Sequence, residues 1–459
     1  MKNILNIPLE QKFDVSMERK TQFGEVKTDY KLIEKMFDLL PEETFKDPTI
    51  KWCDPCAGSG EFMIFLYKKL YLSLQDKIPE PKSRSKHIIS NMLWMIEINP
   101  FHIPNLRNIF GEGANIIHQS FLDTHKLKVD IIVGNPPYNI NGKIVVPTNN
   151  KSSKKRDGIT IWPDFIAHSV NLLKNSSIGY LLFITPCIWM KKDHFFYNYM
   201  TNKDIIKINT LNSSETNAIF HGEAQTPTCY FLLKATSVSD INSVDIFDKI
   251  TNKYESFRIR KDNESFSLPL CAISIVNKFR KFDCYESLIA YKTNMRRGYK
   301  GLELSDIRDE QHPYINISSC KLRQGRPVLK INYSNIPCSY HKTPKLVFAH
   351  KMYGFPYLDI EGKYGISNRD NYVIKDYNIF ELMKIRDFFY TRLGMFMIEI
   401  SRYRMRYFER HIFEILSEII CQITDVKDEV LFDIFNLDDM ERKYVNNFHK
   451  KQYLKTIPP

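Results

Sequence analysis

The sequence predicts an α/β fold with a mainly parallel sheet, followed by a mixed α+β domain. A strand, a glycine-containing turn and a helix follow one another in residues 50–67, and a second strand ends in a carboxylate at Glu97. A later apolar strand ends abruptly in the tetrad Asn135-Pro136-Pro137-Tyr138. Strands that alternate with helical segments are typical of a parallel sheet. Functional side chains are therefore expected at the carboxyl ends of these strands.

The composition indicates a globular protein with a polyanionic partner. The 459 residues are 43% hydrophobic and carry a formal net charge of +12, which favours partners such as nucleic acids. No apolar run reaches the roughly 18 residues that a bilayer requires, and the amino terminus lacks the apolar core of a secretory signal. Nine scattered cysteines favour a reducing compartment. We therefore expect a cytoplasmic protein without a membrane partner.

The first motif is a glycine-containing turn between a strand and a helix. Residues 50–53 predict the end of a strand, residues 54–60 form the turn, and residues 62–67 are an apolar helical run. Glycines let the backbone pass close to a ligand, and the first turn of the helix offers free N–H groups. This is the start of a Rossmann-like unit. Its two glycines match neither the full dinucleotide fingerprint nor a Walker loop.

Cys53 and Cys56 have the spacing of a redox or zinc pair. No second pair at matching spacing and no neighbouring histidine accompany them, which disfavours both functions. We interpret them as two small thiols packed at the junction of strand and turn, and we expect no bound metal.

A carboxylate ends the second predicted strand. Residues 91–97 form this strand, and Glu97 can accept both hydroxyls of a ribose. Residues 76–87, which are polar and hold two prolines, are an expected surface insertion that lengthens the separation from the glycine turn. A third strand over residues 114–117 leads to Phe121, whose ring can flank an adenine or pack in the core.

The tetrad is the most informative motif of the chain. Its two prolines end the strand of residues 130–134 and hold the next peptides rigidly outside the sheet. The side-chain oxygen of Asn135 and the carbonyl of Pro136 can accept the two N–H bonds of a planar amino group, while Tyr138 stacks on its plane. The tetrad therefore predicts a clamp for an –NH2 group.

Together these motifs resemble the gamma class of S-adenosylmethionine-dependent DNA adenine-N6 methyltransferases. Residues 23–28 are similar to the segment that precedes the glycine loop in that class, although Asp29 stands in place of the usual proline. Ser120 occupies a position that is often acidic, and Asp123 is a candidate replacement for that acid. The resemblance implies S-adenosyl-L-methionine as cofactor, bound by Thr28, Asp54, Cys56, Gly58, Gly60, Glu97, Ser120, Phe121 and Asn135.

The resemblance extends through the end of the catalytic domain. Residues 178–186 are similar to a late core strand, and residues 219–227, with a strand over 228–233, are similar to the last motif. An aromatic of that motif packs against the extruded base, which implies Phe220; the alternative is a core phenylalanine. An adenine must leave the duplex to reach the tetrad. Tyr138 and Phe220 are expected to stack on its two faces.

Basic segments supply the expected DNA contacts. Residues 139–158 form a polar, basic loop directly after the tetrad, and residues 291–300 and 321–326 interleave cations with aromatics or glycine. The contacts predicted from them are Lys151, Lys154, Lys155, Arg156, Arg296, Arg297, Arg323 and Arg326.

Two domains are expected, a catalytic domain over residues 1–245 and a target-recognition domain over residues 246–459. In the second domain, a β-rich stretch over residues 345–350 resembles target-recognition domains of the class. Amphipathic helices are expected after it: residues 381–400 are mostly apolar and are expected in the core, and residues 402–407 predict a basic helix face.

The resemblance implies a site-specific DNA adenine-N6 methyltransferase, the modification enzyme of a restriction-modification system. Double-stranded DNA is the expected substrate, a cognate restriction endonuclease is a partner in such systems, and we expect a monomer. The alternatives are an RNA adenine-N6 methyltransferase and a protein glutamine-N5 methyltransferase, because that amide is also a planar –NH2 group. The long basic second half disfavours the glutamine enzyme.

Overall fold

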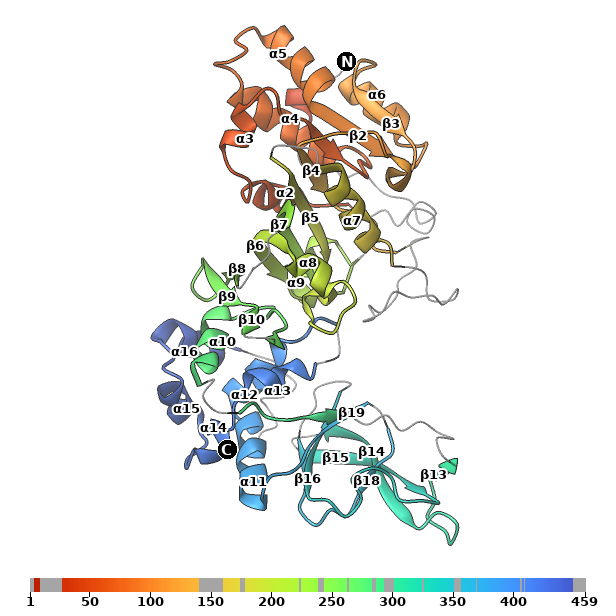
Figure 1. The fold of residues 1–459 in the computed structure, drawn as a ribbon, viewed down its shortest axis with the longest axis vertical. Coiled ribbons are helices and arrows are strands. Elements are labelled where there is room, and N and C mark those ends of the chain that lie inside the picture. The colour runs from red at the N-terminus through yellow and green to blue at the C-terminus, as the bar shows by residue number, and fades with distance from the viewer. Residues whose placement is uncertain are drawn as a thin grey trace. The chain divides into compact units, whose positions relative to one another are not determined.

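The computed structural model divides into two compact units (Figure 1). One unit comprises residues 1–247 and 256–268, and the other comprises residues 248–255 and 269–459. The assignment of catalysis and target recognition to separate domains stays a prediction. The described residues are 4–8, 27–139, 160–173, 178–222, 224–237, 243–261, 264–282, 286–292, 301–323, 326–350, 356–368, 370–404, 407 and 409–448.

The first unit is built on a nine-stranded sheet in the order β3-β2-β1-β4-β5-β7-β6-β8-β9. Strands β3, β2, β1, β4 and β5 pair in parallel, whereas β7 is antiparallel to both of its neighbours. The mainly parallel sheet predicted from the sequence is therefore confirmed. The strands are β1 (Trp52–Asp54), β2 (Leu93–Glu97), β3 (Asn115–His118), β4 (Ile131–Gly134), β5 (Tyr180–Pro186), β6 (Lys203–Leu211), β7 (Thr228–Ser237), β8 (Ser243–Asp248) and β9 (Lys253–Arg258).

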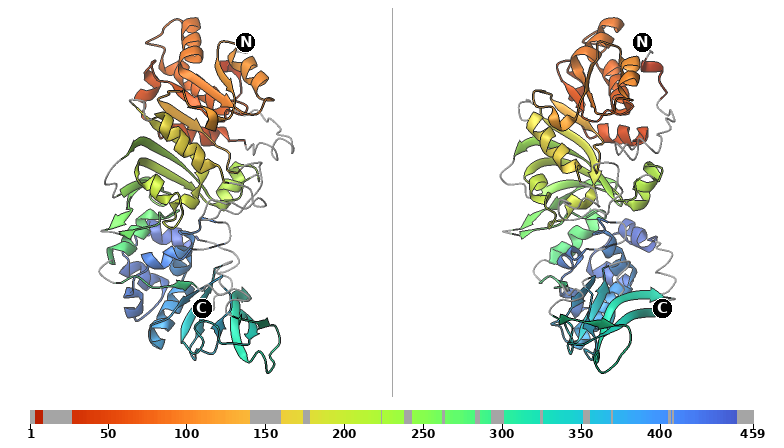
Figure 2. Two further views of the ribbon diagram at one scale, coloured as in Figure 1. Left: turned by 45° about the vertical axis from the view of Figure 1, so that its right-hand side comes forward. Right: turned by 90° about the vertical axis from the view of Figure 1, so that its right-hand side faces the viewer.

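Helices cover this sheet, and α7 packs against β4 and β5 (Figure 1; Figure 2 gives two further views). All four residues of β4 are buried, as expected for a strand covered on both faces. The helices are α2 (Tyr30–Phe37), α3 (Glu43–Lys46), α4 (Glu61–Ser73), α5 (Pro81–His87), α6 (Ile103–Phe110), α7 (Trp162–Leu173), α8 (Tyr197–Thr201) and α9 (Ser213–Ile219), with short helical turns at Ile88–Met92, Phe121–Asp123 and Cys187–Met190.

The expected surface insertion is exposed but contains regular structure. Glu80 caps α5 by accepting a hydrogen bond from the backbone N–H of Lys82 at 2.9 Å, and Pro81 occupies the first turn. Arg84 is buried and donates to the carbonyl of Ile78 at 3.0 Å. The proline that suggested a loop is therefore the start of a helix.

The second unit contains two four-stranded sheets, ordered β12-β19-β16-β17 and β13-β15-β14-β18. Ile317, Val347, Ile366 and Val373, which come from both sheets, form a fully buried cluster. The strands are β12 (Tyr291–Lys292), β13 (Leu304–Ser305), β14 (Tyr314–Arg323), β15 (Arg326–Ser334), β16 (Lys345–Ala349), β17 (Tyr357–Asp359), β18 (Gly365–Ile366) and β19 (Asn371–Ile374). The helices are α10 (Ile273–Phe279), α11 (Ile379–Tyr390), α12 (Arg392–Glu399), α13 (His411–Ile415), α14 (Ile419–Gln422), α15 (Asp428–Ile434) and α16 (Asp439–Asn446).

The apolar segment over residues 381–400, predicted to be helical and to lie in the core, forms most of the two helices α11 and α12. Thr391 ends α11, and its hydroxyl accepts a hydrogen bond from the backbone N–H of Gly394 at 3.0 Å, so it also caps α12. Many side chains of both helices are buried, in agreement with the predicted core position. Among the described residues, no helix is long and apolar enough to span a membrane.

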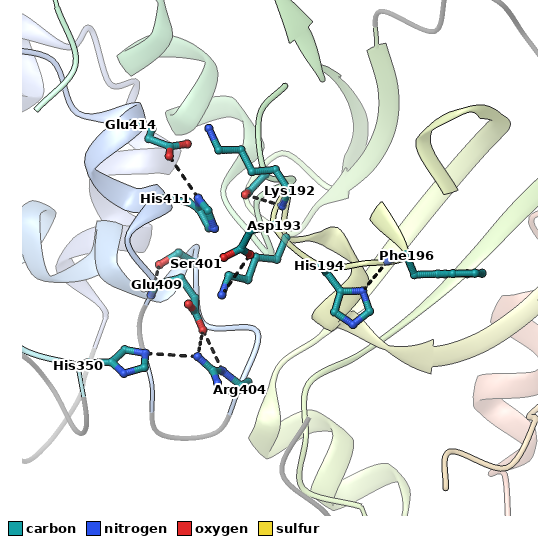
Figure 3. A network of polar contacts seen from close by, with 12 residues as sticks. Lys192, Asp193, His194, Phe196, His350, Ser401, Arg404, Glu409, His411 and Glu414 are labelled. Carbon is teal, nitrogen blue, oxygen red and sulfur yellow. Dashed lines mark hydrogen bonds and ion pairs between the residues drawn. The ribbon is translucent and has the colours of Figure 1, made fainter. Parts of the chain in front are cut away.

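The basic helix face predicted over residues 402–407 is wrong. Arg404 lies outside any helix and forms an isolated β-bridge with Tyr407. Its guanidinium donates to Glu409 from Nε at 2.9 Å and to Nε2 of His350 at 3.3 Å (Figure 3). Tyr403 is buried. Tertiary hydrogen bonds, which a periodicity argument does not include, replace the helix here.

Candidate active site

The candidate active site lies at the carboxyl ends of β1 and β4. After β1 the chain adds β2 and β3 on one side of this strand and then β4 and β5 on the other, so the ends of the neighbouring strands β1 and β4 form a topological switch point. Open parallel sheets bind ligands at such points. Asp54 ends β1, and Asn135 follows the last residue of β4. The structure thus brings together the two motifs that the sequence analysis singled out.

The side chain of Asn135 has a defined orientation. Its Nδ2 atom donates a hydrogen bond to the hydroxyl of Thr28 at 3.2 Å, and Thr28 itself is buried. The Oδ1 atom is buried and, within the part of the chain that the structure describes, has no hydrogen-bond partner. The residue after Thr28 is Asp29, which caps α2 by accepting from the backbone N–H of Lys31 at 2.8 Å. Asp29 therefore starts the helix at the position where the family usually has proline.

Tyr138 combines a half-exposed side chain with a buried hydroxyl. The hydroxyl has no hydrogen-bond partner among the described residues, and burial raises the pKa of the phenol well above its ordinary value. The group is therefore a neutral phenol, and its ring is the part that can contact a ligand.

Glu97 anchors the glycine turn through both carboxylate oxygens. Oε2 accepts the backbone N–H of Gly58 at 2.7 Å, and Oε1 accepts that of Asn99 at 2.7 Å. Gly60 has a φ of 93° and begins α4, and a Cβ on it would lie 3.0 Å from the side chain of Leu106. This backbone conformation and close approach favour glycine.

Cys56 connects the glycine turn to the tetrad. Its thiol donates to the backbone carbonyl of Asn135 at 3.2 Å. Burial, followed by the charge of Asp54, raises the pKa values of both Cys53 and Cys56 well above the ordinary value. Both thiols therefore stay protonated, as small packed side chains do.

Negative charge is concentrated at the end of β1. The pKa of Asp54 is raised to about 8, mainly by burial and also by the carboxylates of Glu97 and Glu61, while a hydrogen bond from the backbone N–H of Cys56 opposes the shift. A positively charged ligand would relieve this accumulation of acidic groups. The site is therefore suited to a cation.

Gly134 is a functional position that the sequence analysis missed. A Cβ on this residue would lie 2.9 Å from Oδ1 of Asp54, so only glycine lets β4 pass this carboxylate. The sequence feature that could have identified Gly134 is its position as a glycine between the apolar run of β4 and the tetrad. The sequence analysis also did not single out Ile98, an apolar residue that directly follows Glu97 and is 54% exposed.

Other predicted site residues are packed inside the first unit. Phe121 is buried and stacks on Phe165 with ring centroids 5.4 Å apart. Phe220 is only 1% exposed and caps α9. Ser120 is partly exposed, and its carbonyl accepts the backbone N–H of Asp123 at 3.1 Å. The roles proposed for these residues stay predictions.

The predicted DNA contacts are not placed by the structure. Lys151, Lys154, Lys155, Arg156, Arg296 and Arg297 lie outside the described residues. Arg323 and Arg326 pair across the end of the β14–β15 hairpin, but their side chains are not described.

Comparison with known proteins finds a family match within the first unit. Residues 64–217 match the protein family described as Eco57I restriction-modification methylase. This segment is therefore similar to the restriction-modification methylases. An uncharacterized adenine-specific methylase of Mycoplasma pneumoniae is 23% identical, and the match covers 45% of this chain and 66% of that protein. The predicted recognition of an S-adenosylmethionine-dependent methylase is confirmed.

Solved structures of restriction-modification proteins resemble the chain weakly. The type IIL enzyme MmeI in complex with DNA is 11% identical, with a TM-score of 0.46, and the match covers 86% of this chain and 68% of MmeI. A modification subunit of a putative type I restriction enzyme from Vibrio vulnificus is 12% identical, with a TM-score of 0.35. That match covers 53% of this chain and 49% of the subunit. The assignment of the methylase segment depends on the family match and not on these structures.

Proposed function

We propose that this chain is a site-specific DNA adenine-N6 methyltransferase of a restriction-modification system. The observation that carries the proposal is the buried, unpartnered Oδ1 of Asn135 at the end of β4. A buried acceptor without a donor is costly, so its persistence suggests that a ligand supplies the donor. The family of the methylase segment and the adenine-specific relative support an adenine amino group as that donor.

The residues at the switch point fit S-adenosyl-L-methionine. This cofactor, when bound, supplies an electrophilic methyl group on a positively charged sulfonium. Gly58 leaves room for a close approach of the ligand to the turn, Glu97 can accept ribose hydroxyls, and Asp54 gains a negative charge, which a cation can neutralise, when it ionises near pH 8. Thr28 is buried beside Asn135 and borders the same site.

The chain's own residues would activate the base by position and hydrogen bonding. The lone pair of the adenine amino group is delocalised into the ring, which makes this nitrogen a weak nucleophile. Hydrogen bonds to Oδ1 of Asn135 and to the rigid carbonyl of Pro136 favour a more pyramidal nitrogen in the transition state. Tyr138 stacks on the base and replaces part of the stacking lost when the base leaves the duplex.

Duplex DNA and a cognate restriction endonuclease are the proposed partners, and the chain is proposed to act as a monomer. The net charge of +12 supports a polyanionic substrate. The cations of the predicted loop over residues 139–158 and Phe220 remain candidate contacts to the DNA backbone and the flipped base.

The proposal is tested by expressing the full chain in a host that lacks adenine methylation and mapping N6-methyladenine by single-molecule sequencing. Modification of adenines in one sequence motif is the expected result. The Asn135→Ala variant should lose modification while it binds the cofactor normally, and Lys77→Ala, on the exposed surface, is the matched control. Unmodified DNA from cells with folded, cofactor-binding protein would refute the DNA activity, and modified RNA in the same cells would identify the alternative substrate.

A further inference from the structure

A pocket of about 560 Å³ lies within the second unit. Its volume is in the range of roughly 300–1,000 Å³ that is typical of small-molecule sites. It is formed by the segment between β15 and β16, by the start of β14 and by the residues after β19. Its lining includes Tyr314, Tyr340, His341, Lys342, Lys375 and Asp376.

Backbone strain is concentrated in this pocket. Tyr340, Lys342 and Asp376 have φ values of 62°, 61° and 70°. They are three of the seven non-glycine residues with positive φ in the described part of the chain. Such conformations are unfavourable for residues with a side chain and are enriched at ligand sites. They persist only where the surrounding structure holds them in place.

The strained segment is held by contacts on its far side. Gly362 packs so closely that a Cβ would lie 2.4 Å from the backbone nitrogen of Thr343, and its carbonyl accepts the backbone N–H of Lys342 at 2.8 Å. The ammonium of Lys345 bonds the carbonyl of Thr343 at 3.0 Å and the buried carboxylate of Asp359 at 2.6 Å. The pocket wall is therefore preorganised, which lowers the entropic cost of binding a ligand.

Aromatic rings provide surfaces for a planar group. The rings of Tyr314 and His341 meet edge to face, with their centroids 5.5 Å apart. The ring centroids of Tyr340 and Tyr291 are 6.4 Å apart. Burial, together with Lys342 and Lys345, holds the pKa of His341 below its ordinary value. A neutral imidazole offers one donor and one acceptor to a heterocyclic edge.

Cations stand beside these rings. Lys342 is exposed, and Lys375 lies 4.5 Å from the centre of the Tyr291 ring while it pairs with Asp376 at 2.6 Å. The hydroxyl of Tyr291 also donates a hydrogen bond to Asp376 at 2.9 Å. The carboxylate of Asp376 therefore accepts from both Lys375 and Tyr291. Rings flanked by lysines are the combination that binds a base and its phosphate.

We propose that this pocket binds one nucleotide, with its base against the tyrosine rings and its phosphate at Lys342 and Lys375. The nucleotide is either free or part of a DNA strand. Binding of a nucleotide within a DNA strand rests on the proposed function, whereas binding of a free nucleotide does not. The site is separate from the tetrad and its cofactor residues, all of which belong to the first unit.

The test uses two glycine variants of the full chain. Lys342→Gly and Tyr340→Gly each remove a side chain from the pocket while they relieve a left-handed conformation. The Tm of Lys342→Gly should stay equal or rise, whereas Tyr340→Gly also loses packing against the buried cluster of the second unit, so its binding is measured well below its own Tm. Asn436→Gly, at an exposed residue with a φ of 52° in the same unit, is the matched control. The probes are dTMP, measured by calorimetry, and a fluorescein-labelled oligothymidylate of about 12 nucleotides, measured by anisotropy.

Each glycine variant should weaken binding about tenfold, as expected for the loss of one charged contact or one stacking surface, and the control should not. Weakened binding of dTMP alone would identify a free nucleotide as the ligand, and weakened binding of the oligonucleotide alone would identify DNA. Failure of both probes to bind, or equal binding by wild type and both variants, would overturn the proposal. All measurements are repeated with Asn135→Ala, so loss of methyl transfer and loss of pocket binding are observed separately.

Discussion

The side-chain amide of Asn135 donates to the hydroxyl of Thr28 at 3.2 Å, across 107 positions of sequence. This bond occupies the nitrogen end of the amide and leaves Oδ1 as the end available to a ligand. The orientation matters because, of the two ends of the Asn135 amide, only the oxygen can accept a hydrogen bond from an amino group. A residue predicted to bind cofactor thus also positions the acceptor of the tetrad.

Thr28→Val should reduce kcat for DNA methylation about tenfold. Valine keeps the shape of threonine but cannot accept the amide hydrogen bond, so Asn135 loses its preferred orientation, at a cost of about 1.4 kcal/mol in the transition state. Thr28→Ser, which keeps the hydroxyl, should retain most of the rate. Equal rates in the serine and valine variants would show that this bond does not orient the amide.

Gly134→Ala should destabilise the first unit by about 1–3 kcal/mol, because its methyl group would lie 2.9 Å from Oδ1 of Asp54. The same displacement should weaken cofactor binding, which calorimetry measures alongside urea unfolding. Gly113→Ala is the control, since its Cβ would meet its nearest neighbour, Ser90, at an ordinary 3.7 Å. A Gly134→Ala protein as stable as this control would contradict the close packing.

Asp54 should make cofactor affinity depend on pH. Its pKa is raised from 3.8 to about 8, so the carboxyl is largely protonated near neutrality and gains its charge as the pH rises through about 8. Affinity for a cationic cofactor should rise over the same range, and Asp54→Asn should abolish that dependence. Parallel pH profiles for wild type and Asp54→Asn would exclude Asp54 as the titrating group.

The ionisation of Asp54 should also lower the stability of the folded protein as the pH rises, whereas it increases the affinity for the cofactor. Because the folded pKa exceeds the unfolded one, its contribution to stability is complete below about pH 4 and is lost as the pH rises through about 8. Asp54→Asn should therefore be more stable than wild type at about pH 8, by on the order of a few kcal/mol in urea unfolding. If Asp54→Asn were no more stable than wild type at about pH 8, ionisation of the buried Asp54 carboxyl would not destabilise the folded protein.

Local patterns explain why much of the first unit could be predicted. An apolar run that ends in two prolines, and a strand that enters a glycine turn, depend on residues adjacent in sequence. The bond from the Cys56 thiol to the carbonyl of Asn135 joins residues 79 positions apart, and the approach of Gly134 to Asp54 depends on how strands pair. No local pattern contains that information.

In the second unit, local sequence patterns predict even less of the structure. The basic residues near Arg404 suggested a helix face, but the hydrogen bonds of Arg404 go to Glu409 and to His350, which lies 54 positions away. Tertiary contacts of this kind override periodicity. Of the predicted contacts to DNA, Arg323 and Arg326 belong to the β14–β15 hairpin, and the others lie outside the described residues.

His350 should make the second unit sensitive to acid. Nε2 of this buried histidine accepts a hydrogen bond from Arg404, and burial lowers its pKa from 6.5 to about 4 (Figure 3). Since the folded pKa is depressed, stability is complete above about pH 6.5 and is lost as the pH falls toward 4, by roughly 3 kcal/mol. His350→Gln should reduce this loss in urea unfolding, whereas His118→Gln, at an exposed site, should not. An unchanged acid dependence in His350→Gln would mean that other groups cause it.

Tyr138 should act through its ring and not through its hydroxyl. Tyr138→Phe removes a buried hydroxyl that has no partner among the described residues, so stability should rise by about 1 kcal/mol while methylation is retained. Tyr138→Ala removes the ring and should lose roughly 1–3 kcal/mol of stacking on the flipped base. The fluorescence of 2-aminopurine at the target position, with Asn135→Ala as the background, measures this stacking without turnover. If Tyr138→Phe were as impaired as Tyr138→Ala, the hydroxyl would have a direct role, and the stacking function would have to pass to another aromatic such as Phe220.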